Sequence, residues 1–212
     1  MREKTEKLLS VLKLQPVVPV LIIEDAAHAV PLARALVAGG LKAIEITLRT
    51  PAALAAIEAV AKEVEGAVPG AGTILNPAQY EQAVKAGSQF IVSPGTTPAL
   101  IEAEKDHAAS FLPGAATATE AMTLLDAGYE VMKFFPAEQA GGASYLKSLS
   151  SPLAGVTFCP TGGISLKNAR DYLSLPNVIC VGGSWVAPAN LVASGDWAGI
   201  TALASEAAAL KG

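Results

Sequence analysis

Cysteine is scarce in this chain of 212 residues, which contains only Cys159 and Cys180. Their separation does not match the ligand spacing of a structural zinc site, and no set of His, Asp and Glu residues does so either. We therefore expect no metal and no cofactor. Both thiols are expected to be reduced core residues, as is usual in proteins without a disulfide framework. A nucleophilic role for Cys159 is the alternative, but no histidine is positioned to activate it.

Clusters of positive charge are also absent. Charged residues make up 16% of the chain and the net charge is −4, so a nucleic-acid partner is not expected. No apolar run reaches membrane-spanning length. The first residues, MREKTEKLLSVLKL, lack the pattern of a signal peptide. These absences predict a cytoplasmic protein that binds neither nucleic acid nor membrane.

Linkers and low-complexity segments are lacking as well, so residues 1–212 are expected to form one domain. What the sequence contains instead is a repeated unit of a short apolar run, a loop and an alanine-rich helical stretch. The runs occur eight times, at 17–23, 42–47, 67–73, 90–95, 110–115, 129–136, 157–163 and 178–184. Strands that alternate with helices predict parallel pairing, and eight units predict an α/β fold of the (β/α)8 TIM-barrel type. An open, doubly wound sheet is the alternative.

Helices are expected at both ends of this repeat. Residues 1–14 contain an amphipathic helix that should precede the first strand and cover the bottom of the barrel, and 196–211 should form a last outer helix. Three helical stretches end in Ala-Gly, at Gly39, Gly87 and Gly128. A glycine at that point predicts a left-handed C-cap that turns the chain back toward the sheet.

Charged residues interrupt the second strand with a period of two. Ile44, Ile46 and Leu48 form an apolar row that should face the helices. Glu45 and Arg49 should therefore face the interior of the barrel, where an unpaired charge is costly. This placement favours a functional role, although a structural ion pair between the two side chains would also explain it.

The sixth strand, YEVMKFFP, carries one lysine among apolar residues. Alternation directs Met132 and Phe134 toward the helices, and Lys133 and Phe135 toward the interior. Burial disfavours the charged form of an amine, and a neutral amine attacks a ketone to form a Schiff base. The alternative is a lysine whose long stem lets the ammonium reach water.

Two threonines and a proline complete the predicted interior site. Thr73 has the parity of Ala71 on the third strand, and Thr161 has the parity of Cys159 on the seventh. Both threonines lie toward the carboxyl ends of their strands, where barrel active sites are built. The Pro94 and Phe135 side chains would line this site. Both threonines are also ordinary β-branched strand residues, which is the plainer explanation.

Paired glycines follow the last two strands, in TGGIS (161–165) and GGSW (182–185). Glycine lets backbone N–H groups approach an anion, and barrels often bind phosphate at these two loops. A helix that starts near Pro188 would add its N-terminal dipole. Either glycine pair alone would fit a tight turn. Together they predict a phosphate site formed by Gly162, Gly163, Gly183 and Ser184.

These groups together predict chemistry on a phosphorylated keto acid. Lys133 would form an imine with the ketone, and the imine would draw electrons from a neighbouring carbon–carbon bond as it breaks. Glu45, which is the only carboxylate predicted in the interior, would carry the proton. Arg49 would hold the substrate carboxylate through two parallel hydrogen bonds.

Six motifs resemble those of one enzyme family, and they occur in order along essentially the whole chain. They are EITLRT (45–50), GAGTILNP (70–77), FIVSPG (90–95), KFFPAE (133–138), FCPTGGIS (158–165) and GGSW (182–185). The family is 2-keto-3-deoxy-6-phosphogluconate (KDPG) aldolase, which also acts on 4-hydroxy-2-oxoglutarate (KHG). The resemblance implies a homotrimeric class I aldolase of the Entner–Doudoroff pathway that cleaves KDPG to pyruvate and glyceraldehyde 3-phosphate.

The resemblance also implies a role for each residue of the predicted site. Lys133 matches the Schiff-base lysine and Glu45 the acid/base residue. The remaining matches are Arg49 and Thr73 at the pyruvate carboxylate, Pro94, Phe135 and Thr161 in the substrate pocket, and Gly162, Gly163, Gly183 and Ser184 at the phosphate. Pro69 departs from the aliphatic residue expected in the third strand, and we expect it to disturb that strand and shift Thr73.

Several alternative functions fit the same residues. A sister aldolase would prefer the galactonate epimer or unphosphorylated KHG. An isomerase or a thiamin-phosphate-type synthase would also bind phosphate, but neither needs a buried lysine opposite a glutamate. A non-catalytic sugar-phosphate-binding barrel would bind the same ligands without forming an adduct with pyruvate.

Overall fold

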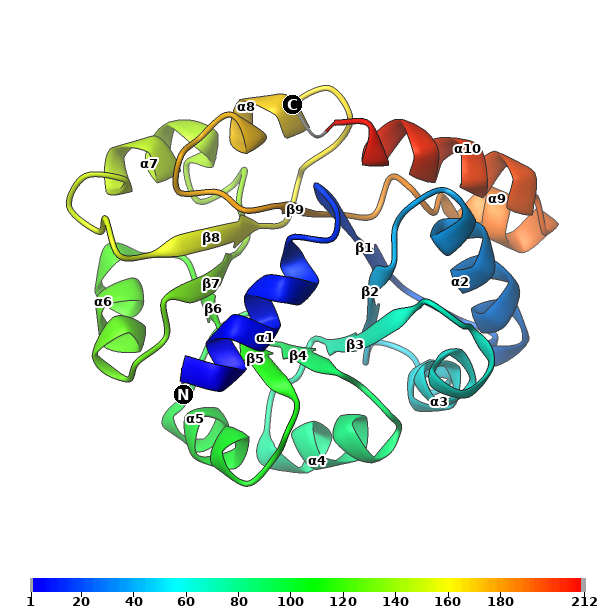
Figure 1. Cartoon of the computed structure of the whole chain (residues 1–212), viewed down its shortest axis with the longest axis horizontal. Coiled ribbons are helices and arrows are strands. Elements are labelled where there is room, and N and C mark those ends of the chain that lie inside the picture. The colour runs from blue at the N-terminus through cyan, green and yellow to red at the C-terminus, as the bar shows by residue number, and fades with distance from the viewer. Residues whose placement is uncertain (1, 211–212) are drawn as a thin grey trace.

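The computed structural model describes residues 2–210 and has an α/β architecture with two parallel sheets. The larger sheet has the order β5-β4-β3-β2-β1-β9 and the smaller has the order β6-β7-β8. The strands are β1 (Val17–Leu21), β2 (Ala43–Thr47), β3 (Val68–Gly72), β4 (Phe90–Val92), β5 (Ser110–Leu112), β6 (Gly114–Ala115), β7 (Val131–Phe134), β8 (Thr157–Pro160) and β9 (Val181–Gly183). They lie around the centre of the molecule, and most helices lie outside them (Figure 1).

The helices follow the strands in alternation. They are α1 (Arg2–Leu12), the 3-10 helix η1 (Ala26–His28), α2 (Ala29–Ala38), α3 (Ala53–Glu63), α4 (Pro77–Lys85), α5 (Pro98–Lys105), α6 (Ala118–Asp126), α7 (Gly142–Leu149), α8 (Ala169–Leu173), α9 (Ala189–Ser194) and α10 (Trp197–Ala208). Among residues 2–210, none of these helices combines the length and the apolar character that crossing a membrane requires.

Each of the eight predicted apolar runs contains a strand, but the hydrogen bonds divide the strands between two sheets. The fifth run contains both β5 and β6, which are separated by Pro113. β5 pairs with β4, whereas β6 pairs with β7. Two isolated parallel bridges, Phe158 with Val178 and Thr161 with Gly182, join β8 to the chain that enters and forms β9. The open, doubly wound alternative would place helices on both faces of a flat sheet, which is not the arrangement in Figure 1.

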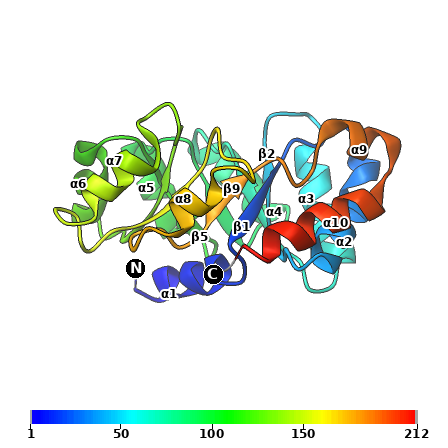
Figure 2. The ribbon, with the colours of Figure 1, turned by 90° about the horizontal axis from the view of Figure 1, so that it is seen from above.

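Helix α1 lies beneath one end of the strands, at the lower edge of the molecule in Figure 2. Its Leu8 and Leu12 belong to a small core cluster that includes Phe90 and Val131 from the strands. The amphipathic helix expected within residues 1–14 is therefore confirmed, although Met1 lies outside the described residues. The predicted last helix corresponds to α10, and the residues after 210 also lie outside the described part of the chain.

The two core clusters confirm the alternation predicted for β2 and β7. Ile44, Ile46, Met132 and Phe134 belong to the large cluster between strands and helices. Ala43 and Val131 belong to the small cluster, which packs strand residues against helix α1 on the other face of the strands. Residues of the second set have the parity of Glu45 and Lys133, so both charged side chains face the interior.

The glycine predictions are confirmed at two positions and wrong at the third. Gly87 and Gly128 have φ values of 102° and 92°. Gly39 has φ −79°, and the left-handed residue is Gly40, with φ 95°. Gly39 instead allows the end of α2 to pack closely against α10, since a Cβ atom there would lie 2.7 Å from the carbonyl oxygen of Thr201 on α10.

Pro69 does not interrupt the third strand, so the expected disturbance is absent. β3 pairs with β2 from Val68 to Gly72, with Pro69 opposite Ile44. The Pro69 carbonyl accepts a hydrogen bond of 2.8 Å from the amide of Gln89, the residue before β4. In a parallel strand the backbone nitrogen and carbonyl of a residue point toward the same neighbouring strand. The Pro69 nitrogen therefore points toward the loop before β4, where no strand hydrogen bond is required. No ladder bond is lost.

Candidate active site

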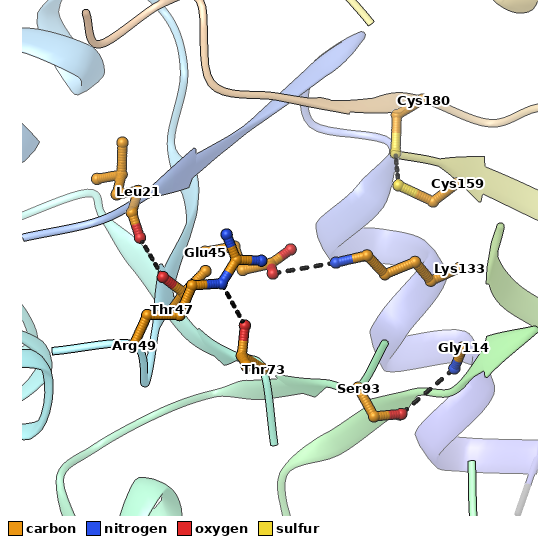
Figure 3. Close-up of polar contacts among 10 residues, drawn as sticks. All are labelled: Leu21, Glu45, Thr47, Arg49, Thr73, Ser93, Gly114, Lys133, Cys159 and Cys180. Atoms are coloured by element: carbon orange, nitrogen blue, oxygen red, sulfur yellow. Dashed lines mark hydrogen bonds and ion pairs between the residues drawn. The ribbon is translucent and has the colours of Figure 1, made fainter. Parts of the chain in front are cut away.

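A lysine and a glutamate meet on the interior side of the strands. Lys133 Nζ on β7 lies 3.2 Å from Glu45 Oε1 on β2, and the two side chains are 3% and 4% exposed (Figure 3). The ammonium of Lys133 therefore does not reach water, which excludes the solvent-exposed alternative. The two groups are close enough to exchange a proton directly.

The neighbouring strand leaves room for the Glu45 side chain. Gly72 on β3 lies next to β2, and a Cβ atom there would come within 2.6 Å of Glu45 Cδ. Any other residue would therefore collide with the carboxyl group. Glycine at this position allows Glu45 to extend toward Lys133.

Arg49 follows β2 and does not form the ion pair with Glu45 that the sequence allowed. Its Nε donates a hydrogen bond of 3.0 Å to Thr73 Oγ1 (Figure 3). Thr47 shares the interior face with Glu45 and Arg49, but its hydroxyl donates to the Leu21 carbonyl at 2.8 Å. Thr47 therefore links β1 to β2, and the Arg49 guanidinium keeps its terminal nitrogens for another partner.

Thr73 reaches the interior through its backbone conformation rather than through strand parity. Ala71 belongs to the outer core cluster, so simple alternation would direct Thr73 toward the helices. The interior parity predicted for Ala71 and Thr73 is therefore wrong. Its φ is 60°, and among residues 2–210 it is the only residue other than glycine with a positive φ. Such a conformation is strained in a β-branched residue, and here it turns the hydroxyl toward Arg49.

A cavity of about 150 Å³ gathers most of the remaining predicted residues. The predicted residues that line it are Arg49, Phe135, Thr161, Gly162, Gly163, Gly183 and Ser184. Lys133 Nζ lies 5.4 Å from the centre of the Phe135 ring, which places the amine near the same cavity. Pro94 is not among the lining residues, and its carbonyl oxygen instead lies against Gly114.

Sequence reasoning missed the contribution of the first strand. Val20 and Ile22 also line the cavity, and Ile22 is 52% exposed. Both have the parity of Val18, which belongs to the interior cluster. The shared parity with Val18, and the position of Ile22 just beyond the end of β1, could have identified Val20 and Ile22 as cavity residues from the sequence.

The two glycine-rich loops present free backbone donors beside the cavity. Gly162 and Gly163 have φ values of 105° and 74°, which glycine adopts readily. Within the described residues, the amides of Gly163 and Ser184 donate to no protein acceptor, whereas the bridge between Thr161 and Gly182 places the Gly162 amide against the Gly182 carbonyl. Helix α9 begins directly after Pro188, as expected. Amides of this kind suit an anion such as a phosphate.

The cysteines are core residues, as expected. Cys159 and Cys180 are buried thiols with their sulfur atoms 3.5 Å apart (Figure 3). Across residues 2–210, no group of three His, Cys, Asp or Glu side chains is arranged to hold a metal ion.

The fold and these residues define a class of protein, namely an α/β enzyme of the parallel type with a buried lysine–glutamate pair next to a glycine-lined cavity. The chain belongs to the KDPG and KHG aldolase family, whose model matches residues 8–203. It is 50% identical over 198 residues to the KHG/KDPG aldolase of Escherichia coli K12, with 93% of each chain covered.

Two solved structures are similar over nearly the whole chain. The KDPG aldolase of Zymomonas mobilis ZM4 with 3-phosphoglycerate is 53% identical, with a TM-score of 0.92 and coverage of 98% of this chain and 97% of that one. The Legionella pneumophila KDPG aldolase, with pyruvate captured as a covalent carbinolamine, is 43% identical, with a TM-score of 0.92 and coverage of 94% and 97%.

Proposed function

We propose that this protein is a class I aldolase that cleaves KDPG to pyruvate and glyceraldehyde 3-phosphate, and KHG to pyruvate and glyoxylate. The observation that carries the proposal is the buried contact of 3.2 Å between Lys133 Nζ and Glu45 Oε1. An amine that forms an imine needs a proton carrier beside it, and this pair supplies both groups. The covalent pyruvate adduct of the Legionella relative supports the same chemistry.

Lys133 and Glu45 are the proposed catalytic residues. The Lys133 amine adds to the ketone carbon, and loss of water gives an iminium. Glu45 takes the proton of the substrate hydroxyl as the carbon–carbon bond breaks, and the electron pair of that bond moves to the iminium to form an enamine. The aldehyde leaves, Glu45 returns a proton to the enamine carbon, and water hydrolyses the imine to release pyruvate.

The remaining residues bind the two ends of the substrate. Arg49, held by Thr73, is proposed to take the pyruvate carboxylate. Phe135 and Thr161 form walls of the pocket, and the wall role of Pro94 stays a prediction. The phosphate is proposed to lie at Gly162, Gly163, Gly183 and Ser184. The phosphoglycerate bound by the Zymomonas relative supports a phosphorylated ligand.

Borohydride reduction in the presence of pyruvate tests the proposal. The reductant converts an imine into a stable amine, so peptide mass spectrometry should find a pyruvate adduct on Lys133. An adduct on another lysine, or none, would contradict the assignment. Lys4 provides the comparison within the same digest, because it is a partly buried lysine that lies beside Glu104.

The preferred substrate is tested by kinetics. The glycine-rich loops favour a phosphorylated substrate, so the Michaelis constant for KDPG should be lower than that for KHG. A higher constant for KDPG, or a preference for its galactonate epimer, would identify the sister aldolase instead.

We also propose that the two sheets form one closed (β/α)8 barrel and that residues 1–212 form a single domain. The bridges from Phe158 to Val178 and from Thr161 to Gly182 support closure, since they connect the smaller sheet to the β9 side of the larger.

A homotrimer is proposed from the family resemblance, and light scattering after gel filtration would measure its mass. The cytoplasmic location and the independence from cofactors stay predictions.

A further inference from the structure

The loop after β7 supports the glycine-rich loop after β8. The amide of Ala137 donates to the Thr161 carbonyl at 2.8 Å, and the amide of Glu138 donates to the Gly162 carbonyl at 3.1 Å. The chain that leaves the lysine strand is therefore bonded directly to the loop proposed to bind phosphate. Lys133 and that loop are linked through the six-residue segment 133–138.

The Glu138 side chain also packs against this loop. A Cβ atom on Gly163 would lie 2.6 Å from Glu138 Cγ, so the loop rests on the glutamate with no room for a larger residue. On its other side, the Gly163 carbonyl accepts a hydrogen bond of 3.2 Å from Asn168 Nδ2. The position of Gly163 therefore depends on where the Glu138 side chain is held.

Tyr172 on α8 holds Glu138 in that position. Its hydroxyl donates to Glu138 Oε1, and its ring is completely buried in the large core cluster. Burial, followed by the hydrogen bond to Glu138, raises the pKa of the Tyr172 hydroxyl, so this group stays protonated and remains a donor. The buried Tyr172 ring is restricted to one side-chain conformation, whereas an exposed glutamate can adopt many. The tyrosine therefore determines where the Glu138 carboxyl group lies.

We infer that Tyr172 is a positioning residue for the substrate phosphate, acting through Glu138 on the loop at Gly162 and Gly163. This inference rests on the proposed aldolase function and deepens it. Tyr172 does not touch the catalytic pair in this arrangement. Its effect should therefore appear with phosphorylated substrates and be absent with substrates that lack a phosphate.

The test is the variant Tyr172→Phe, which removes the hydroxyl and keeps the ring. We expect the Michaelis constant for KDPG to rise about fivefold, the factor that corresponds to one lost hydrogen bond. The turnover number for KDPG and the kinetics with unphosphorylated KHG should stay unchanged. The yield of the borohydride-trapped pyruvate adduct should also stay unchanged, which shows that the variant is folded.

Tyr129→Phe is the matched control. The Tyr129 hydroxyl donates to Glu104 Oε2 at 2.6 Å, so the chain contains a second contact between a buried tyrosine and a glutamate. This contact lies beside Lys4 of α1, at the opposite end of the strands from the glycine loops. Its loss should leave the ratio of kcat/KM for KDPG over KHG at the wild-type value.

Glu138→Ala provides a second route to the same test, since Glu138 is exposed and its truncation should not prevent folding. If both residues act through one contact, the double variant should lose no more kcat/KM for KDPG than the more impaired of the two single variants. A ratio unchanged in Tyr172→Phe and Glu138→Ala, or an equal loss with both substrates, would overturn the inference. If the wild-type protein itself forms no pyruvate adduct, the proposed function fails instead, so the two failures are distinguishable.

Discussion

Lys133 and Glu45 face each other across the interior of the strands, with Nζ and Oε1 separated by 3.2 Å and both side chains nearly fully buried. Each residue comes from a different sheet, β7 in the smaller and β2 in the larger. A lysine without this partner would be an isolated buried charge, which is costly. The ion pair with Glu45 offsets the free energy of burying the Lys133 charge, and it places an amine next to a proton carrier.

Glu45→Gln should separate imine formation from proton transfer. The amide keeps the shape and a hydrogen-bond partner for Lys133, but it cannot accept a proton. We expect the pyruvate adduct to form while kcat for KDPG falls by about 10²-fold or more. Glu104→Gln is the control, because Glu104 is also a buried glutamate and lies away from Lys133. Normal turnover in Glu45→Gln would remove Glu45 from the proposed role.

Gly72→Ala should impair the enzyme without any change in charge. The added methyl group would lie within 2.6 Å of Glu45 Cδ and displace the carboxyl group from Lys133. A displacement of about 1 Å at a catalytic group can lower turnover by about 10²-fold. Gly155→Ala is the matched control, since a Cβ atom there meets nothing within 4 Å. Steady-state kinetics of the two variants test this steric argument, and equal activities would refute it.

Thr73→Val should weaken binding of every substrate that carries the pyruvate carboxylate. The change removes the acceptor of the 3.0 Å hydrogen bond from Arg49 Nε and preserves the shape of the side chain. We expect KM to rise about tenfold for both KDPG and KHG, as for a lost hydrogen bond to a charged group. Thr73→Ser should restore near wild-type values. A rise confined to KDPG would instead connect Thr73 with the phosphate.

Helix α6 should lose stability in acid through its capping box. Glu120 accepts hydrogen bonds from the amides of Ala116 and Thr117 at 2.8 and 2.9 Å, and the Ala116 bond is the largest cause of its lowered pKa. Since the folded-state pKa lies below the ordinary value of 4.5, this contribution is present above about pH 4.5 and disappears as the pH falls through the folded value.

Urea unfolding of Glu120→Gln measures this contribution. The variant should be less stable than wild type near pH 7, and the difference should shrink as the pH falls below 4.5. Thr117→Ala is the comparison, because it removes the hydroxyl half of the box and should cost about 1 kcal/mol near pH 7. A difference for Glu120→Gln that is constant with pH would show that the charge makes no contribution.

Several of these residues could be identified from the sequence because strand alternation is a local rule. Period-two patterns correctly placed Glu45 and Lys133 inside, and the order of motifs indicated the family. The same rule failed at Thr73, where φ departs from the strand conformation. Alternation assumes extended backbone, so it cannot detect one left-handed residue at the end of a strand.

The sequence by itself determined that Glu45 and Lys133 face the interior, which loops are rich in glycine and which family the chain resembles, since these depend on neighbours along the chain. Only the tertiary structure decided that Lys133 meets Glu45, that Arg49 bonds to Thr73, and that Tyr172 holds Glu138 beneath the glycine loop. Each of these contacts joins segments at least 24 residues apart, so their geometry depends on how the strands and helices pack around one another.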